Sequence, residues 1–246
     1  MKDDEKVRAR QDSVIEAEFK ELLLNPNCRG ISRGKWGRDA LMHAARNGHA
    51  KCVQLLIPLS DTGVEDNLGQ TALMCAAKNG HAVCVQLLLP TCDALDTDNE
   101  GITALMYAAS YGEADCVRLL LSVSGAQASD QIGKTALMCA AENGHAACVQ
   151  LLLPKCDALA KNNAGMTALM HAASHGEADC VQRLLSVGGA RARDQSGHTA
   201  SEHARANGYG YMADFIDAYV LSQSESSSLR VSAALVASSQ SKPRRI

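Results

Sequence analysis

One spacing recurs along most of this chain. Cysteines stand at positions 52, 84, 116, 148 and 180, each 32 residues after the one before. Two columns of glycine share the period: Gly37, Gly69, Gly101, Gly133, Gly165 and Gly197, then Gly48, Gly80, Gly112, Gly144, Gly176 and Gly208. A period of roughly 20 to 50 residues is typical of arrays whose small units bury their apolar faces only by stacking on one another. The sequence therefore predicts a solenoid.

Each unit contains the signals for two short helices. Thr71 is placed to cap the first helix, and Leu73 and Met74 begin an apolar pattern at helical spacing. Gly80 ends that helix because glycine reaches the left-handed conformation at little cost. A second helix follows, and Pro90 prevents its continuation. The unit is thus predicted to be two antiparallel helices and a loop.

The repeated pattern Gly-x-Thr-Ala-Leu-Met-x-Ala-Ala-x-x-Gly, followed by Cys-Val-x-Leu-Leu, resembles the ankyrin repeat from about residue 34 to 221. The resemblance implies an all-α ankyrin-repeat solenoid of stacked helix-turn-helix units. The period is 32 where the family usually has about 33, and the missing residue falls in the finger loop. We therefore expect short or irregular fingers. Alanine replaces the usual proline at the first helical position, and methionine replaces the usual histidine: Met42, Met74, Met106, Met138 and Met170.

The ends of the array differ from its centre. The pattern from Ser13 to Glu16 predicts a capping box for the helix of an incomplete first unit, and Met212, Phe215 and Ile216 are expected to close the core at the other end. Residues 222–246 contain nine serines and end in basic residues, so we expect a flexible tail. The predicted organisation is a charged segment 1–12, a repeat domain 13–221 and the tail 222–246. The domain divides into 13–33, 34–65, 66–97, 98–129, 130–161, 162–193 and a capping unit 194–221.

Composition and charge exclude several classes of function. The chain has 24 basic and 27 acidic residues, and this balance provides no field to hold nucleic acid or an anionic membrane. No apolar run is long enough for a membrane helix, and the first residues lack the apolar core of a signal peptide. We expect a cytoplasmic monomer that binds other proteins.

Catalytic motifs are missing from the sequence. It contains no glycine-rich phosphate loop, no Gly-x-Ser-x-Gly elbow and no paired catalytic carboxylates, so we expect neither an enzyme nor a cofactor. The periodic cysteines are expected to be small buried hydrophobes, because helices about 8 to 10 Å apart hold them too far apart for disulfides. Cys28, Cys92 and Cys156 fall in loops, and nothing nearby favours a lowered thiol pKa.

His171 and His175 have the i, i+4 spacing found in zinc sites, and Glu177 follows. The pair alone is a weak signal. Position 171 belongs to a column whose members lie one repeat apart, which is too far for a shared ion. We expect polar or half-buried helix residues there and no metal.

Alternate units resemble each other more than adjacent units do. Residues 67–98 match 131–162 at 23 of 32 positions, and 99–130 match 163–194 at 23 of 32. Duplication of a 64-residue pair is the simplest explanation. In these two comparisons, ten of the compared positions are ones that the family usually presents to a partner, and seven of those ten differ between the duplicated units. Of the remaining 54 positions, 11 differ. Sequence drift on any exposed surface contributes to this enrichment. The enrichment at these positions supports a recognition face.

The resemblance and the lack of catalytic motifs together predict a non-catalytic scaffold or adaptor that binds a partner through its concave first-helix and finger face. The predicted contact residues are Trp36, Arg38, Arg46, Leu68, Gln70, Lys78, Glu100, Ile102, Tyr111, Ile132, Lys134, Glu142, Met166 and His175. Trp36 has an alternative role in packing over the N-terminal cap. A second hypothesis is a targeting or regulatory fragment that acts through the Ser-rich, basic-ended tail. A third is an enzyme that uses the cysteines or histidines.

Overall fold

The structure is a computed structural model that describes residues 36–123 and 125–224. The helices are α2 (Ala40–Arg46), α3 (Ala50–Leu56), the short 3-10 helix η2 (Ile57–Leu59), α4 (Ala72–Lys78), α5 (Ala82–Leu88), α6 (Ala104–Tyr111), α7 (Ala114–Leu120), α8 (Ala136–Glu142), α9 (Ala146–Leu152), α10 (Ala168–His175), α11 (Ala178–Leu185) and α12 (Ala200–Ala206). Residues 210–224 are also helical.

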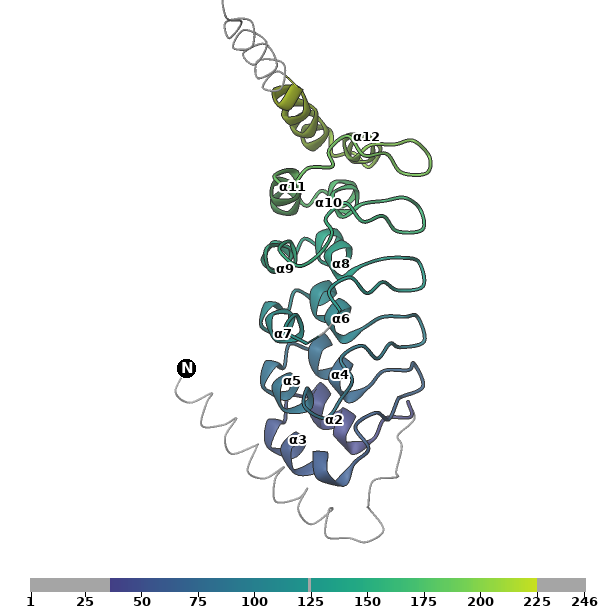
Figure 1. Ribbon diagram of the computed structural model, residues 1–246, viewed down its shortest axis with the longest axis vertical. Helices are drawn as coiled ribbons and strands as arrows, with labels where there is room; N and C mark the ends of the chain where they lie inside the picture. The colour runs from purple at the N-terminus through teal and green to yellow at the C-terminus, as the bar shows by residue number, and fades with distance from the viewer. Residues whose placement is uncertain (1–35, 124, 225–246) are drawn as a thin grey trace, which may run out of the picture.

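The helices stack in two rows (Figure 1). The first helices of the units, α2, α4, α6, α8, α10 and α12, form the row beside the fingers, and the second helices, α3, α5, α7, α9 and α11, form the row away from them. Each first helix packs against the first helices of its neighbouring units. The predicted all-α solenoid is confirmed.

Each first helix begins and ends as its residues predict. The Thr71 hydroxyl accepts a hydrogen bond from the Met74 amide at 3.4 Å, and the Asp39 carboxylate caps α2 in the same way at 2.8 Å. Gly80 has a φ angle of 74°, which favours glycine. The Glu113 carboxylate of the next unit also lies where a Cβ on Gly80 would stand. The flexible Glu113 side chain could move aside, so the turn conformation, and not the stacking, is what requires glycine here.

The core consists of aliphatic side chains and cysteines. Leu88, Leu120 and Leu152 are each 0% exposed at equivalent positions of successive second helices. The periodic cysteines are buried, and no disulfide joins the described cysteines. Burial raises the pKa of the Cys116 thiol to about 12, so this group stays protonated at neutral pH. The prediction that this column is buried is confirmed.

The fingers are short, as expected, and they are also regular. In every described finger an Asp or Asn closes the same turn. Asp98, for example, donates its amide to the carbonyl of Ile102 at 3.1 Å, and the Gly101 amide donates to the Asp98 carbonyl at 3.0 Å. Neighbouring fingers are linked through the backbone, as by the Asn99 amide and the Leu68 carbonyl at 3.1 Å. Because each finger also bonds to the next, the loss of one residue per unit leaves a regular row.

The described C-terminal end differs from the prediction in two ways. Met212 and Ile216 are buried as expected, but Phe215 is 50% exposed and does not close the core, because it lies on the outer side of the last helix. That helix continues to residue 224, beyond the predicted domain boundary at 221. The segments 1–12 and 13–33, Cys28 and most of the predicted tail lie outside the described residues.

Candidate functional site

Most of the predicted contact residues lie at the surface formed by the fingers and the exposed ends of the first helices, which we call the first-helix face. Seven of them are exposed: Trp36, Arg46, Leu68, Glu100, Tyr111, Ile132 and His175. Six are half-buried: Arg38, Lys78, Ile102, Lys134, Glu142 and Met166. One, Gln70, is buried. Trp36 is 58% exposed, which leaves its side chain open to a partner.

The prediction that Gln70 contacts a partner is corrected by its burial. Its side-chain amide donates a hydrogen bond to the Tyr107 hydroxyl at 2.7 Å, and that hydroxyl donates to the Asp98 carboxylate at 2.5 Å. Burial and the neighbouring Asp98 carboxylate raise the pKa of Tyr107, so its hydroxyl keeps its proton. Gln70 is therefore an internal support for a tyrosine of the next unit.

Lys78 of α4 lies against two tyrosines of α6, and we call these three residues the Lys78 cluster. The Lys78 ammonium is 4.9 Å from the centre of the Tyr107 ring and 5.3 Å from that of Tyr111. Both distances are within the range of cation–π attraction, roughly 6 Å. Tyr107 is 8% exposed and Tyr111 is 51% exposed. The cluster thus presents a positioned cation beside one open aromatic ring.

Glu142 of α8 lies against two histidines of α10, and together with Lys134 these residues form the Glu142 cluster. Lys134 forms an ion pair with the Glu142 carboxylate, which also lies 3.8 Å from His171 Nδ1 and 3.7 Å from His175 Nε2. Burial alone would raise the pKa of Glu142, but Lys134 and the histidines lower it. Burial lowers the pKa of His171 to about 4, despite the opposing effect of Glu142.

The two clusters occupy equivalent places in the duplicated pair. Adding 64 to the number of each residue of the Lys78 cluster, and of its supports Gln70 and Asp98, gives the equivalent residue of the second pair. All five such positions differ: Gln70 and Lys134, Lys78 and Glu142, Asp98 and Asn162, Tyr107 and His171, Tyr111 and His175. These residues meet in space across a repeat boundary. The duplicated scaffold therefore carries two different sets of interacting side chains at one equivalent location.

A periodic column of Asp and Asn residues was not recognised from the sequence. Asp66, Asp98, Asp130, Asn162 and Asp194 each open a finger, and their side chains accept hydrogen bonds from backbone amides of the same finger. Asp66 additionally holds Arg38 at 2.9 Å. Their recurrence every 32 residues was visible in the sequence. Hydrogen bonding of Asp and Asn to nearby backbone amides is typical of turns, so the column could have been assigned to finger structure.

The described part of the chain lacks several other kinds of site. Within it, no group of three or more His, Cys, Asp or Glu residues is arranged to hold a metal ion. No helix of the same residues is long and apolar enough to cross a bilayer. Cys92 and Cys156 are half-buried, and burial raises the pKa of both thiols. This is the opposite of the activation that a nucleophilic cysteine needs.

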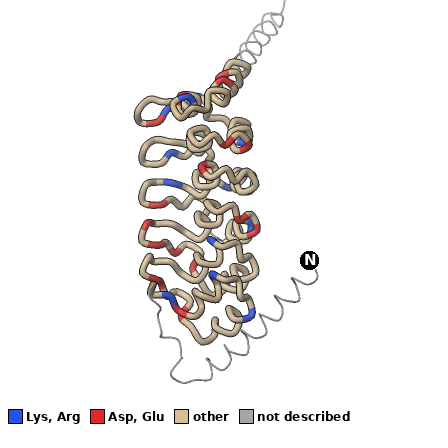
Figure 2. Tube along the Cα trace, turned by 180° about the vertical axis from the view of Figure 1, so that it is seen from behind, with Lys and Arg blue, Asp and Glu red and all other residues tan. Residues whose placement is uncertain are grey.

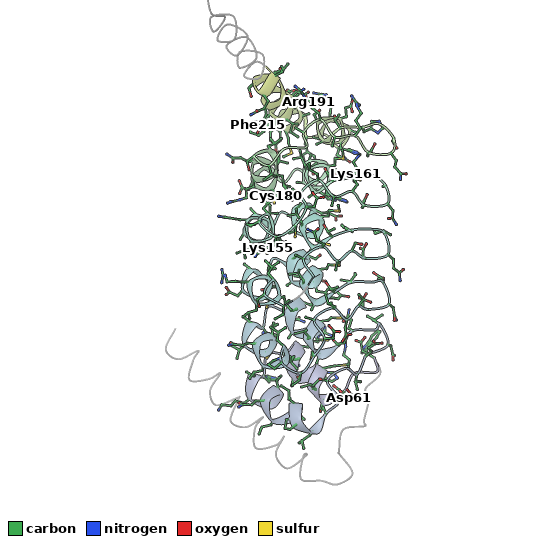
Figure 3. The ribbon with its side chains drawn as sticks, in the orientation of Figure 1. Asp61, Lys155, Lys161, Cys180, Arg191 and Phe215 are labelled. Atoms are coloured by element: carbon green, nitrogen blue, oxygen red, sulfur yellow. The ribbon has the colours of Figure 1, made fainter. Side chains whose placement is uncertain are left out.

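A cavity of about 480 Å³ lies at the C-terminal end of the stack, and three arginines contribute to its lining. Arg205 pairs with two aspartates, Arg193 pairs with Glu202, and Arg191 donates to a backbone carbonyl. Figure 3 shows Arg191 at the end of the stack from which the last helix projects. Because each arginine is already held by groups of its own chain, this cavity provides no open cationic site.

A family model matches the sequence that forms these stacked helix pairs, turn glycines and linked fingers. The model for ankyrin repeats, in three copies, matches residues 15–98, 84–162 and 148–217. This chain belongs to the ankyrin-repeat family. Ankyrin repeats are generally protein–protein interaction modules, and the family is typically non-enzymatic. A search of curated proteins finds no significant match to this ankyrin-repeat chain.

Proposed function

We propose that this ankyrin-repeat protein is a non-catalytic scaffold or adaptor that binds a partner protein through its first-helix face. The observation that supports this most directly is the position of the seven exposed contact residues. They come from fingers and first-helix ends of successive units, so they form one extended surface. Large side chains among them, such as Trp36 and Tyr111, are of the type that contributes most to binding at protein interfaces.

The scaffold under this surface is well ordered by its own interactions. Fingers bond to fingers through the backbone, and the Tyr107 ring is held by Gln70 and Asp98. A surface whose side chains are already positioned loses little conformational entropy on binding. The proposal includes a cytoplasmic location, where thiols remain reduced, in accord with the absence of disulfides among the described cysteines.

The test compares the two sides of the solenoid. Partners are first identified by proximity labelling in cells, and capture is then repeated with purified variants. Tyr111→Ala combined with Lys78→Glu removes a ring and a cation from the first-helix face. The matched control is Gln54→Ala combined with Gln86→Ala, since both glutamines are exposed on second helices. We expect the first pair to weaken capture and the second pair to leave it unchanged, with the same helical circular dichroism for both.

The reverse result would place recognition on the second helices and overturn the proposal. A chain truncated after residue 224 tests the alternative hypothesis, in which the C-terminal tail carries the function. Under our proposal the truncated chain still captures the partner. If capture disappears with the truncation and survives the Tyr111 and Lys78 substitutions, the tail carries the function and the repeats only position it.

A further inference from the structure

The Lys78 cluster differs from the Glu142 cluster in how its cation is used. In the Glu142 cluster the Lys134 ammonium is paired with a carboxylate of its own unit. In the Lys78 cluster the ammonium lies over two tyrosine rings, and no carboxylate of the described residues forms an ion pair with it. One of the duplicated sites is internally neutralised and the other has a cation available.

A second available cation lies one unit away. Arg46 ends α2 at the position equivalent to Lys78 in α4, and the two helices pack side by side. Helices packed in this way lie about 8 to 10 Å apart, close enough for side chains at positions i and i+2 of an extended peptide, which share one face, to reach both cations. Within the described chain, Arg46 also forms no ion pair with a carboxylate. Its exposed side chain extends the cationic surface beside Tyr111.

Two of the acidic residues in the fingers that precede α4 and α6 are engaged by other side chains. Asp66 pairs with Arg38, and Asp98 accepts the Tyr107 hydroxyl in addition to two backbone amides. Glu100 is exposed at its finger and would repel an anionic ligand that crossed the finger tips. Acidic residues follow one another along the fingers that precede α4 and α6 (Figure 2). An anionic segment is therefore best accommodated over the ends of α2, α4 and α6, away from those tips.

From this arrangement we infer that the surface of Arg46, Lys78 and Tyr111 binds an acidic segment of the partner protein, with carboxylates at the two cations and an apolar or aromatic side chain against Tyr111. The inference rests on the proposed function and specifies the partner's chemistry. The Tyr107 ring, fixed by Gln70 and Asp98, holds the Lys78 ammonium in place before the ligand arrives.

The experiment is selection of a displayed random peptide library against the purified full chain, because such a library offers acidic and non-acidic segments alike. We expect selected peptides to be enriched in Asp and Glu. Lys78→Glu should weaken their binding by about tenfold or more, equivalent to about 1.4 kcal/mol. Arg46→Glu should act in the same direction, and Lys78→Gln should show a smaller loss because it removes the cation without adding repulsion. Selection against Lys78→Glu should no longer favour acidic peptides.

Lys155→Glu is the matched control, since it makes the same charge change at an exposed turn after α9, on a different part of the solenoid (Figure 3). It should leave peptide binding unchanged. Thermal melts of each variant establish that the fold is retained. Failure to select any peptide, selection of peptides without acidic enrichment, or acidic peptides that bind Lys78→Glu as tightly as the parent chain would each overturn the inference.

The proposed function and this inference fail in different ways. Non-acidic peptides whose binding is lost with Tyr111→Ala would leave the first-helix face as the recognition surface and remove only the acidic chemistry. Peptides that are insensitive to Tyr111→Ala and Lys78→Glu but lost with Gln54→Ala and Gln86→Ala would overturn both.

Discussion

The two duplicated pairs of units, residues 66–129 and 130–193, share their core and differ on their first-helix face. Leu120 and Leu184 are buried equally, at 0% and 1% exposed. Above that shared core, Lys78 faces two tyrosines in one pair, while Glu142 faces two histidines in the other. A solenoid allows this separation because each unit contacts only its neighbours. The stacking residues can remain constant while groups that touch each other on the surface change together.

The largest effects are expected where the two pairs agree. Leu120→Ala should reduce the free energy of unfolding by about 2 to 5 kcal/mol, the usual cost of truncating a fully buried leucine. Leu184→Ala should fall in the same range because it occupies the equivalent place in α11. Urea unfolding followed by circular dichroism measures both losses. A loss below about 1 kcal/mol at either position would show that the second helices do not form a common core.

A smaller effect is expected at the hydrogen bonds found only in the first pair. Tyr107→Phe leaves the buried Gln70 amide and one oxygen of Asp98 without the tyrosine hydroxyl, which should cost about 1 to 3 kcal/mol. Tyr111→Phe removes the same group from an exposed ring and should change stability by less than about 0.5 kcal/mol. Urea unfolding of the two variants gives the comparison. Equal losses of stability in the two variants would contradict a specific role for the hydrogen bonds that join Tyr107 to Gln70 and Asp98.

The second pair should respond to acid at His171, the position where the first pair has Tyr107. Burial lowers the folded-state pKa of His171 to about 4 from an ordinary value of 6.5, so the unfolded chain binds more protons between these values. The stabilising contribution is complete above pH 6.5 and decreases as the pH falls toward 4. The lowered pKa of Glu142 adds a further loss in acid, below its ordinary value of 4.5. Tyr107, at the equivalent place, keeps its proton throughout.

Melting temperatures at several pH values between 7 and 4 measure this response. His171→Tyr places the residue of the first pair in the second and should reduce the decrease in melting temperature. His43→Asn removes an exposed histidine of α2 and should leave the decrease unchanged. An undiminished decrease in the His171→Tyr variant would mean that other groups dominate the acid response.

The smallest difference between the pairs is expected for their thiols. Burial raises the pKa of both Cys84 and Cys148 to about 11, and both are at most 1% exposed. Native protein at neutral pH should label slowly at both positions, and denatured protein should label at all ten cysteines. Mass spectrometry after timed alkylation distinguishes the sites. Rapid native labelling of one but not the other would show that the two pairs differ in core opening.

Much of the scaffold could be predicted because its signals are local and periodic. The cap at Thr71 depends on a residue three places along the chain, and the turn at Gly80 depends on its own φ angle. The same period predicted buried cysteines correctly. It also indicated short fingers, but not how regular they are, because their regularity depends on neighbouring units. In the array, each finger is held by backbone bonds to its neighbours.

The sequence by itself determined the repeat, its caps and its buried column, since those depend on spacing within one unit. The tertiary structure alone decided which surface residues act together. Gln70 reaches a hydroxyl 37 positions away, and Glu142 reaches histidines of the following unit. These contacts depend on how far each helix is displaced from its neighbour and which way its side chains point. Both are consequences of packing between units, and so a buried support such as Gln70 could not be told from an exposed contact such as Tyr111 by its column alone.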